Sequence, residues 1–416
     1  MNQGLTMQFL FVTLALSVQA AFAGEWPQIL GPHRTGIADN EKIADKWPGG
    51  GPKTLWSRRV GEGYAGVAVA GGKVVLFHRL GDSEIAEAMD AKTGSVLWKQ
   101  QFSGKYAGGF ASDNGPRCVP LVHKDYVYLY GISGNLHCLS LKTGKKRWSR
   151  KLAEDYQAPG GYFGAGSTPI VEADKLLLNL GGRPDAGIVA LSPETGKTVW
   201  NATSEKASYS SPTTATIDGV RHAIFVTRLN LVSIDPENGN VRFSLPFGRR
   251  GATVNAATPL VVNGNVFVSA SYGVGAMLVR VETDGAREVW ANDEVMSSQY
   301  TTCVPSGGHL FGISGRQDMG RASLRCLKPD TGKVKWSKDG FGKATLILAD
   351  DKLVILKTNG ELVLAKASTE SYQPLAFARV LRSTALALPA ISNGLLYVRD
   401  TRTLKCLDLK APSTKE

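Results

Sequence analysis

An eleven-residue frame recurs along this chain and constrains the fold more than any other feature. Four copies carry Thr-Gly and end in Trp: AMDAKTGSVLW (88–98), CLSLKTGKKRW (138–148), ALSPETGKTVW (190–200) and CLKPDTGKVKW (326–336). Two copies are weaker: SIDPENGNVRF (233–243) ends in Phe243, and RVETDGAREVW (280–290) lacks the Thr. Such self-similarity is the signature of proteins built from stacked repeats.

One copy with its flanks, residues 118–152, contains four short runs rich in residues that favour β-strands. The runs are 118–123, 126–132, 136–141 and 146–152, and short polar connections separate them. Gly144, in the last connection, can adopt the positive φ that a bulged turn requires. A four-stranded meander cannot bury both of its faces alone, so it must stack against copies of itself.

The count of copies predicts eight blades. Six contain the frame, and residues 344–367 and 387–410 each keep three strands without it. Residues 52–60 look like an orphan outer strand, with Trp56 in the expected place. We therefore expect an all-β fold over residues 52–410: an eight-bladed β-propeller of four-stranded antiparallel blades, with its ring closed by the N-terminal strand.

The segments outside the ring have separate expected roles. Residues 1–23 contain no charged side chain, and an apolar run is followed by small residues up to Ala23. This pattern predicts a signal peptide cleaved near Ala23 and a periplasmic or secreted protein. We expect an N-terminal arm over 24–51 and a disordered tail over 411–416. No later stretch is long and apolar enough to predict a transmembrane segment.

The frame Ala-x-Asp-x-x-Thr-Gly-x-x-x-Trp resembles the tryptophan docking repeat of quinoprotein (PQQ-dependent) alcohol dehydrogenases. The same PQQ-like repeat occurs in the exported outer-membrane assembly lipoproteins of the barrel-assembly machinery. The resemblance covers most of the chain that remains after the predicted cleavage near Ala23, and it specifies the fold more than the function. It implies that the frame tryptophans pack between blades as structural residues: Trp56, Trp98, Trp148, Trp200, Trp290 and Trp336.

A dehydrogenase of this kind is expected to have an adjacent Cys-Cys disulfide over the quinone, ligands for Ca²⁺ and a catalytic Asp. No two of the five cysteines are adjacent, and Cys138, Cys326 and Cys406 occupy one equivalent strand position, as small core residues would. The six histidines are dispersed without metal-binding spacing. We therefore predict no catalytic residues, metal or cofactor; PQQ with Ca²⁺ belongs to the alternative that the chain is an enzyme.

Polar and aromatic residues in the loops that enter the innermost strands are the binding candidates, because loops on such scaffolds carry function and Tyr and Arg are enriched at interface hot spots. Asp113, Asn255 and Lys343 are the pieces that a dehydrogenase site could use. The rim and funnel candidates are Tyr64, Asn114, Arg117, Tyr162, Tyr209, Arg249, Arg250, Asn255, Tyr300 and Lys343.

Three functions remain open for this chain. The first is an exported non-enzymatic scaffold that binds a protein or another cell-envelope component through its rim and central funnel. The second is a PQQ-dependent dehydrogenase. The third is a module that binds a carbohydrate or anionic polysaccharide, suggested by the net charge of +12. The basic residues form short clusters without interleaved aromatics, so no specific nucleic-acid partner is predicted.

Overall fold

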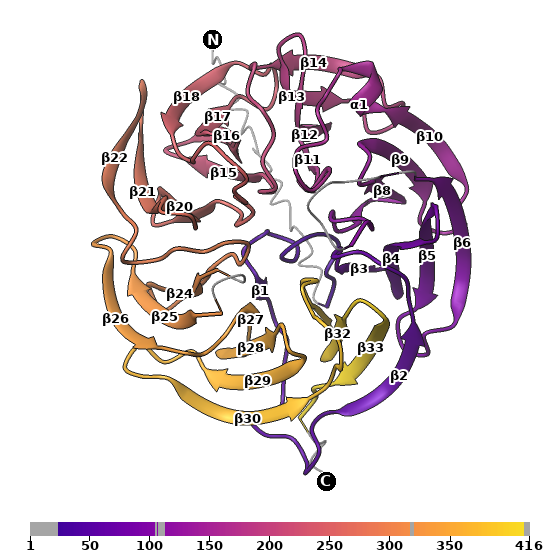
Figure 1. The fold of residues 1–416 in the computed structure, drawn as a ribbon, viewed down its shortest axis with the longest axis vertical. Helices are drawn as coiled ribbons and strands as arrows, with labels where there is room; N and C mark the ends of the chain where they lie inside the picture. Colours follow the sequence, from indigo (N-terminus) through magenta and orange to yellow (C-terminus); the bar gives the residue numbers. More distant parts are fainter. Residues whose placement is uncertain (1–23, 105, 107–112, 317–319, 412–416) are drawn as a thin grey trace, which may run out of the picture.

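The computed structural model describes residues 24–104, 106, 113–316 and 320–411, and these form a ring of eight β-sheets (Figure 1). The predicted signal peptide and most of the predicted tail lie outside the described residues. Among the described residues, the single α-helix is the four-residue α1 (Leu152–Asp155). None of these residues forms a helix that could span a membrane. The predicted fold class, an eight-bladed propeller of antiparallel four-stranded blades, is therefore confirmed.

Each of blades 1 to 7 consists of four consecutive antiparallel strands. Blade 1 contains β3 (Val67–Ala70), β4 (Lys73–Leu80), β5 (Ser83–Asp90) and β6 (Val96–Ser103), and blade 2 contains β7 (Leu121–His123), β8 (Tyr126–Tyr130), β9 (Asn135–Ser140) and β10 (Lys146–Lys151). Blade 3 contains β11 (Ile170–Glu172), β12 (Lys175–Gly182), β13 (Ala186–Leu191) and β14 (Thr198–Ala202), blade 4 contains β15 (Thr213–Ile217), β16 (Val220–Val226), β17 (Asn230–Ile234) and β18 (Val241–Pro246), and blade 5 contains β19 (Leu260–Val262), β20 (Asn265–Ala270), β21 (Gly275–Glu282) and β22 (Gly285–Asn292). Blade 6 contains β23 (Val304–Ser306), β24 (His309–Gly315), β25 (Ala322–Lys328) and β26 (Lys333–Lys338), and blade 7 contains β27 (Ala344–Ala349), β28 (Lys352–Lys357), β29 (Glu361–Lys366) and β30 (Gln373–Arg379).

Blade 8 joins the two ends of the ring. Its inner strands are β31 (Ala390–Ser392), β32 (Leu395–Arg399) and β33 (Thr403–Asp408), and its outer strand is β2 (Lys53–Arg59). Trp56 of β2 lies opposite Cys406 of β33 in an antiparallel pairing. The prediction that the N-terminal strand closes the ring is confirmed.

Two details of the blades differ from the expectation. In blade 2 the innermost strand begins at Leu121 and not at residue 118, because Pro120 has no N–H to give to a strand partner. In blade 7 a fourth strand, β30, is present where the sequence shows only three. Ala376 lies opposite Leu364 there, at the register that Trp holds in the framed blades, so the repeat signal is lost while the strand remains.

The frame tryptophans contact the next blade around the ring. The indole N–H of Trp98 donates a hydrogen bond to the carbonyl of Leu141 over 2.8 Å. Equivalent bonds run from Trp56, Trp148, Trp290 and Trp336 to the carbonyls of Ala91, Pro193, Pro329 and Ser368. The indole nitrogen of Trp200 has no such partner among the described residues. These side chains therefore link successive blades, both by packing and by a directed hydrogen bond.

The frame glycine lies against the tryptophan of the preceding blade. Gly144 has a φ of +71°, and a Cβ placed there would lie 2.6 Å from the ring of Trp98. Gly72 has nearly the same φ, +70°, but a Cβ at Gly72 would meet no atom within 4 Å. The frame requires glycine for two separate reasons, the backbone conformation and the close approach of the indole.

These two glycines provide a matched test of blade packing. Both Gly144→Ala and Gly72→Ala impose a left-handed conformation on alanine, but Gly144→Ala also displaces Trp98. We expect Gly144→Ala to lower the free energy of unfolding by about 2 kcal/mol more than Gly72→Ala does, as overpacking costs in a close-packed interior. Urea denaturation measures both variants. Equal losses would show that the glycine is needed only for its backbone conformation.

The cysteines are core residues, as the sequence predicted. All five are buried and free. Cys138, Cys326 and Cys406 each lie opposite a frame Trp in the adjacent strand, at one common register. Burial raises the pKa of the Cys326 thiol to about 11 and that of Cys406 to about 12. Buried neutral thiols of this kind act as small apolar side chains and are poor nucleophiles.

The segment before β2 crosses the middle of the ring. The two-residue strand β1 (Ile37–Ala38) adds to β27 in parallel and lies near the centre of Figure 1. Trp26 bridges to Val69 of blade 1, and Val122 of blade 2 donates its N–H to the carbonyl of Pro27. In blade 8, Ala44 donates its N–H to the carbonyl of Leu409, beyond the end of β33. This crossing segment, residues 24–44, thus contacts blades on several sides of the ring.

Arg34 anchors the crossing segment to blades 3 and 4. Its side chain is 1% exposed. Its guanidinium donates to the carbonyls of Thr168, Pro169 and Pro212, which lie just before β11 and β15, and to the side chain of Gln28. Burial lowers the pKa of Arg34 to about 9. Its hydrogen-bond partners are neutral oxygens, and no carboxylate of the described residues pairs with this buried cation.

Candidate functional site

All ten predicted binding residues lie at one end of the ring. They occupy the connections between the outer strand of one blade and the inner strand of the next. Because the strands alternate in direction, the loops between the second and third strands of each blade lie at the same end. We call this end the loop face. The structure divides the ten residues into separate groups around it.

The first group joins the loops that enter blades 1 and 2. Arg117 donates to a carboxylate oxygen of Asp113 over 3.0 Å, and its guanidinium lies 4.6 Å from the centre of the Tyr64 ring. Asp113 also accepts the N–H groups of Gly63 and Gly115, so both of its oxygens are engaged. Neighbouring Asn114 is half-buried, and its side-chain oxygen has no partner among the described residues. This group fixes the two loops to each other.

The second group links the loops that enter blades 3, 4 and 5. The hydroxyl of Tyr209 accepts the N–H groups of Tyr162 and Phe163. The backbone N–H of Tyr209 in turn donates to the carbonyl of Asn255. Asn255 is 1% exposed, and its side-chain oxygen has no hydrogen-bond partner among the described residues. Tyr162 is exposed at the surface of this group, with the guanidinium of Arg228 5.6 Å from its ring centre.

The third group lies between blades 6 and 7. The ammonium of Lys343 donates to the side-chain oxygen of Gln299 over 3.0 Å and to the carbonyl of Gly315 over 2.7 Å. It lies 5.5 Å from the ring centre of Tyr300. Burial, and secondarily the hydroxyl of Tyr64, raises the pKa of Tyr300. Lys343 is buried, and its ammonium is engaged in these two hydrogen bonds, so it is not exposed at the loop face.

Arg249 and Arg250 belong to the fourth group, on the loop between β18 and β19. Both are exposed. They line a hollow of about 680 Å³ together with Tyr272, Arg316 and Arg321 from blades 5 and 6. Sequence reasoning missed these three residues because they lie between the second and third strands of their blades, and only the loops between blades were considered. The alternation of strand direction, which places both kinds of loop at one end, was the signal that could have found them.

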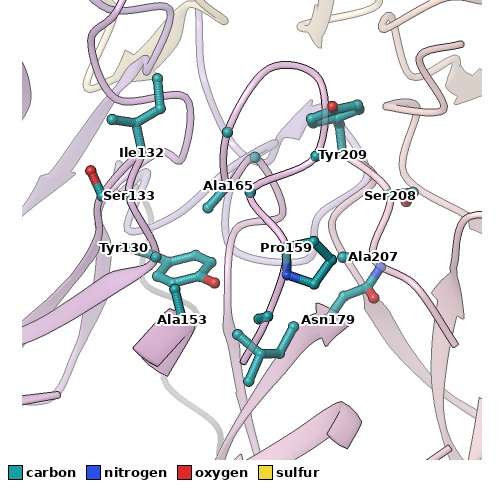
Figure 2. Close-up of a pocket in the computed structure, with 17 residues that line it drawn as sticks. Tyr130, Ile132, Ser133, Ala153, Pro159, Ala165, Asn179, Ala207, Ser208 and Tyr209 are labelled. Carbon is teal, nitrogen blue, oxygen red and sulfur yellow. The ribbon is translucent and has the colours of Figure 1, made fainter. Parts of the chain in front are cut away.

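A second, much smaller hollow lies between blades 2 and 3, and Figure 2 shows its lining. Its volume is about 40 Å³. Asn179, 2% exposed, contributes to the wall and has a side-chain oxygen without a partner among the described residues. A space of this size holds about one water molecule, so it does not accommodate a quinone.

The side chains described here do not fit PQQ with Ca²⁺. No group of three His, Cys, Asp or Glu residues that could hold a metal ion occurs in the described part of the chain. Asp113, the carboxylate that could serve as a base, is occupied by Arg117 and two backbone N–H groups. Asn255 could supply an amide oxygen, but an amide alone neither binds Ca²⁺ nor removes a proton.

The repeat and the ring define the class of this protein as a PQQ-like β-propeller. A family model described as "Outer membrane protein assembly factor BamB" matches residues 51–159 and 81–338. The chain belongs to this family.

Two curated relatives match the chain, one an outer membrane protein assembly factor and the other a quinohemoprotein alcohol dehydrogenase. The chain is 23% identical over 351 residues to the outer membrane protein assembly factor BamB of Burkholderia pseudomallei, which covers 74% of this chain and 86% of that protein. It is 28% identical over 124 residues to the quinohemoprotein alcohol dehydrogenase ADH-IIG of Pseudomonas putida, covering 29% of this chain and 17% of the enzyme. The similarity to the assembly factor therefore extends over far more of both proteins.

Solved structures of an assembly factor and of a quinohemoprotein alcohol dehydrogenase share the fold. BamB from Moraxella catarrhalis matches with a TM-score of 0.61 and 15% identity, covering 86% of this chain and 99% of that one. The quinohemoprotein alcohol dehydrogenase from Comamonas testosteroni matches with a TM-score of 0.69 and 12% identity, covering 96% and 82%. At these sequence identities the structural matches show a shared fold alone.

Proposed function

We propose that this chain is a non-enzymatic, cofactor-free scaffold of the bacterial envelope that acts in outer-membrane protein assembly and binds a protein partner through its loop face. The observation that carries the proposal is the similarity to an outer membrane protein assembly factor over 86% of that protein's length. By this proposal the chain is exported, with residues 1–23 as its signal peptide, and works in the periplasm.

The loop face has the chemistry of a protein-binding surface. Tyr162 is 38% exposed, and Arg249 and Arg250 are exposed on a neighbouring loop. Tyr and Arg are the residue types that contribute most to binding at interfaces, because they combine large contact area with directed hydrogen bonds. The N–H groups of Tyr162 and Phe163 donate to the hydroxyl of Tyr209, which holds this loop in place, so little conformational entropy is lost on binding.

Site-specific photo-cross-linking tests this proposal. A photoreactive amino acid replaces Tyr162 in the organism that carries the chain, and a matched variant carries it at Val199, which is 51% exposed on the outer strand β14. We expect position 162, and not position 199, to give an adduct with a component of outer-membrane protein assembly, identified by mass spectrometry. Adducts of equal yield at both positions, or none at 162, would contradict a specific partner at the loop face.

The dehydrogenase alternative makes a different prediction. Titration of the purified protein with PQQ and Ca²⁺ would raise its melting temperature if the folded state bound the quinone, because a ligand of the native state alone stabilises it. We expect no saturable shift, since the described side chains lack a metal-binding group. A shift that Asn255→Ala abolishes would replace the scaffold proposal with the enzymatic one.

A further inference from the structure

Three exposed arginines lie together on the loop face, where blade 8 meets blade 7. Arg59 is the last residue of β2, Arg382 lies in the connection between β30 and β31, and Arg402 lies between β32 and β33. Val60, next to Arg59, donates its N–H to the carbonyl of Arg402 over 2.8 Å. The N–H groups of Arg382 and Arg402 donate to the two carboxylate oxygens of Asp400. These contacts gather three separate segments of the chain, and we call the three residues the closure arginines.

The carboxylate of Asp400 holds the backbone around the closure arginines. Asp400 is 4% exposed, and its oxygens accept two further N–H groups, from Ser383 and Thr403. The buried guanidinium of Arg399 donates to the backbone carbonyl of Asp400 over 3.2 Å, so a cation already lies beside this carboxylate. Since a carboxylate accepts about four hydrogen bonds, Asp400 fixes both loops and has no position left for an exposed guanidinium.

The charge of the closure arginines has no acidic partner within the described part of the chain. Two exposed arginines on other blades do pair: Arg221 lies 2.6 Å from a carboxylate oxygen of Glu172, and Arg287 lies 2.6 Å from one of Glu282. In contrast, no described carboxylate lies within 4 Å of the side chain of any closure arginine. Guanidinium groups stay protonated at physiological pH, so these like charges repel one another and are neutralised when an anion binds.

The geometry of the guanidinium indicates the type of anion. It is a planar fork of N–H donors that matches a carboxylate or a phosphate with two parallel hydrogen bonds. The three side chains are exposed and come from separate segments, so they suit a ligand that carries several anionic groups on its own surface. An acidic segment of a protein has this property. The loops are already fixed by Asp400, so binding orders little additional backbone.

We infer that the closure arginines bind an acidic segment, rich in Asp and Glu, of the protein partner of the loop face. This inference rests on the proposed function, since it names the chemistry of that partner. The closure arginines lie on the loop face at blade 8, and Tyr162 lies on the same face beyond blade 2. A partner that covers the loop face therefore contacts both places, and each of its carboxylates pairs with a guanidinium in a charge-assisted hydrogen bond.

The test uses a fluorescent oligoglutamate peptide as the probe and the purified full-length protein. Fluorescence anisotropy measures its dissociation constant for the wild type, for Arg382→Gln/Arg402→Gln, and for Lys145→Gln/Lys146→Gln. The two lysines are exposed at the end of blade 2 opposite the loop face, so both double variants remove the same charge. We expect the arginine variant to weaken binding by about tenfold or more, and the lysine variant by about twofold or less.

Thermal unfolding of the same variants separates a binding role from a structural one. Replacing unpaired like charges at the surface removes repulsion and no contact within the protein, so the arginine variant is expected to melt at the same temperature as the wild type or slightly above it. Loss of probe binding together with a melting temperature lowered by several degrees would assign the arginines a structural role and overturn the inference.

The remaining outcomes also decide the matter. Equal weakening by both double variants, or no binding of oligoglutamate to the wild type, would overturn the inference. Binding of phosphatidylglycerol vesicles that only the arginine variant loses, without binding of oligoglutamate, would assign the closure arginines to lipid headgroups instead. Photo-cross-linking at position 162 does not depend on the probe. An adduct there without oligoglutamate binding would thus reject the acidic segment and leave the proposed function standing.

Discussion

Replacing Arg34 by Ala is expected to lower the free energy of unfolding by about 4 kcal/mol, because several buried carbonyl groups lose their donor and each unsatisfied group costs about 1–3 kcal/mol. The variant leaves the buried carbonyls of Thr168, Pro169 and Pro212 without their common donor. It also removes the tie between the crossing segment and blades 3 and 4. Chemical denaturation followed by tryptophan fluorescence measures the change.

Arg59→Ala is the matched control for Arg34→Ala. Arg59 is exposed on β2, and no side-chain interaction of it occurs among the described residues. The control is expected to change stability by about 0.5 kcal/mol or less, as surface substitutions do. Similar small effects for both variants would mean that the crossing segment adds little to the stability of the ring.

Replacing Glu84 by Gln is expected to stabilise the protein at about pH 8 by up to about 3 kcal/mol and to have little effect below about pH 4.5. Glu84 is fully buried on β5, where one oxygen accepts the N–H of Ile132 over 2.8 Å and the other has no partner among the described residues. Burial raises the pKa of Glu84 from 4.5 to about 7. Ionisation of the wild-type side chain at high pH therefore costs free energy that a neutral amide avoids.

The direction of this pH dependence follows from proton linkage. Between about pH 4.5 and pH 7 the folded state holds a proton on Glu84 that the unfolded state has released. The stability that this proton confers is complete below pH 4.5 and is lost as the pH rises through 7. The control is Glu370→Gln, at an exposed position, which is expected to show no such slope. A difference between wild type and Glu84→Gln that stayed constant from pH 4.5 to pH 8 would contradict this account.

The sequence predicted the fold well because the repeat records the contacts that build it. Trp98 needs a carbonyl and a glycine in the next blade, and both are supplied by the same frame one blade later. The closing strand was visible for the same reason, since Trp56 holds the register of the other outer strands. Strand β30 was missed because Ala376 replaces the tryptophan there, and a short strand without the frame has no distinctive pattern.

The candidate site was less predictable from sequence than the fold. Loop position placed all ten residues at one end of the ring, but it did not show which of them are exposed. Asp113 looked available for chemistry, yet Arg117 and two backbone N–H groups occupy it. The hollow lined by Arg249, Tyr272 and Arg321 depends on side chains from three loops that are distant in sequence, and no local pattern records how closely such loops approach. These properties arise from tertiary packing, which residue type and spacing do not encode.

The pairing of β2 with β33 has a consequence for how the molecule is made. Trp56 and Cys406 are about 350 residues apart in the sequence. The β2–β33 pairing that closes the ring therefore forms only after every other blade has been synthesised. Such non-local pairings are slow to form. Until then the outer edge of β33 has open backbone hydrogen-bonding groups that the β2 strand of another copy can occupy equally well. Refolding at high protein concentration is therefore expected to give strand-exchanged oligomers, whereas dilute refolding gives closed single rings.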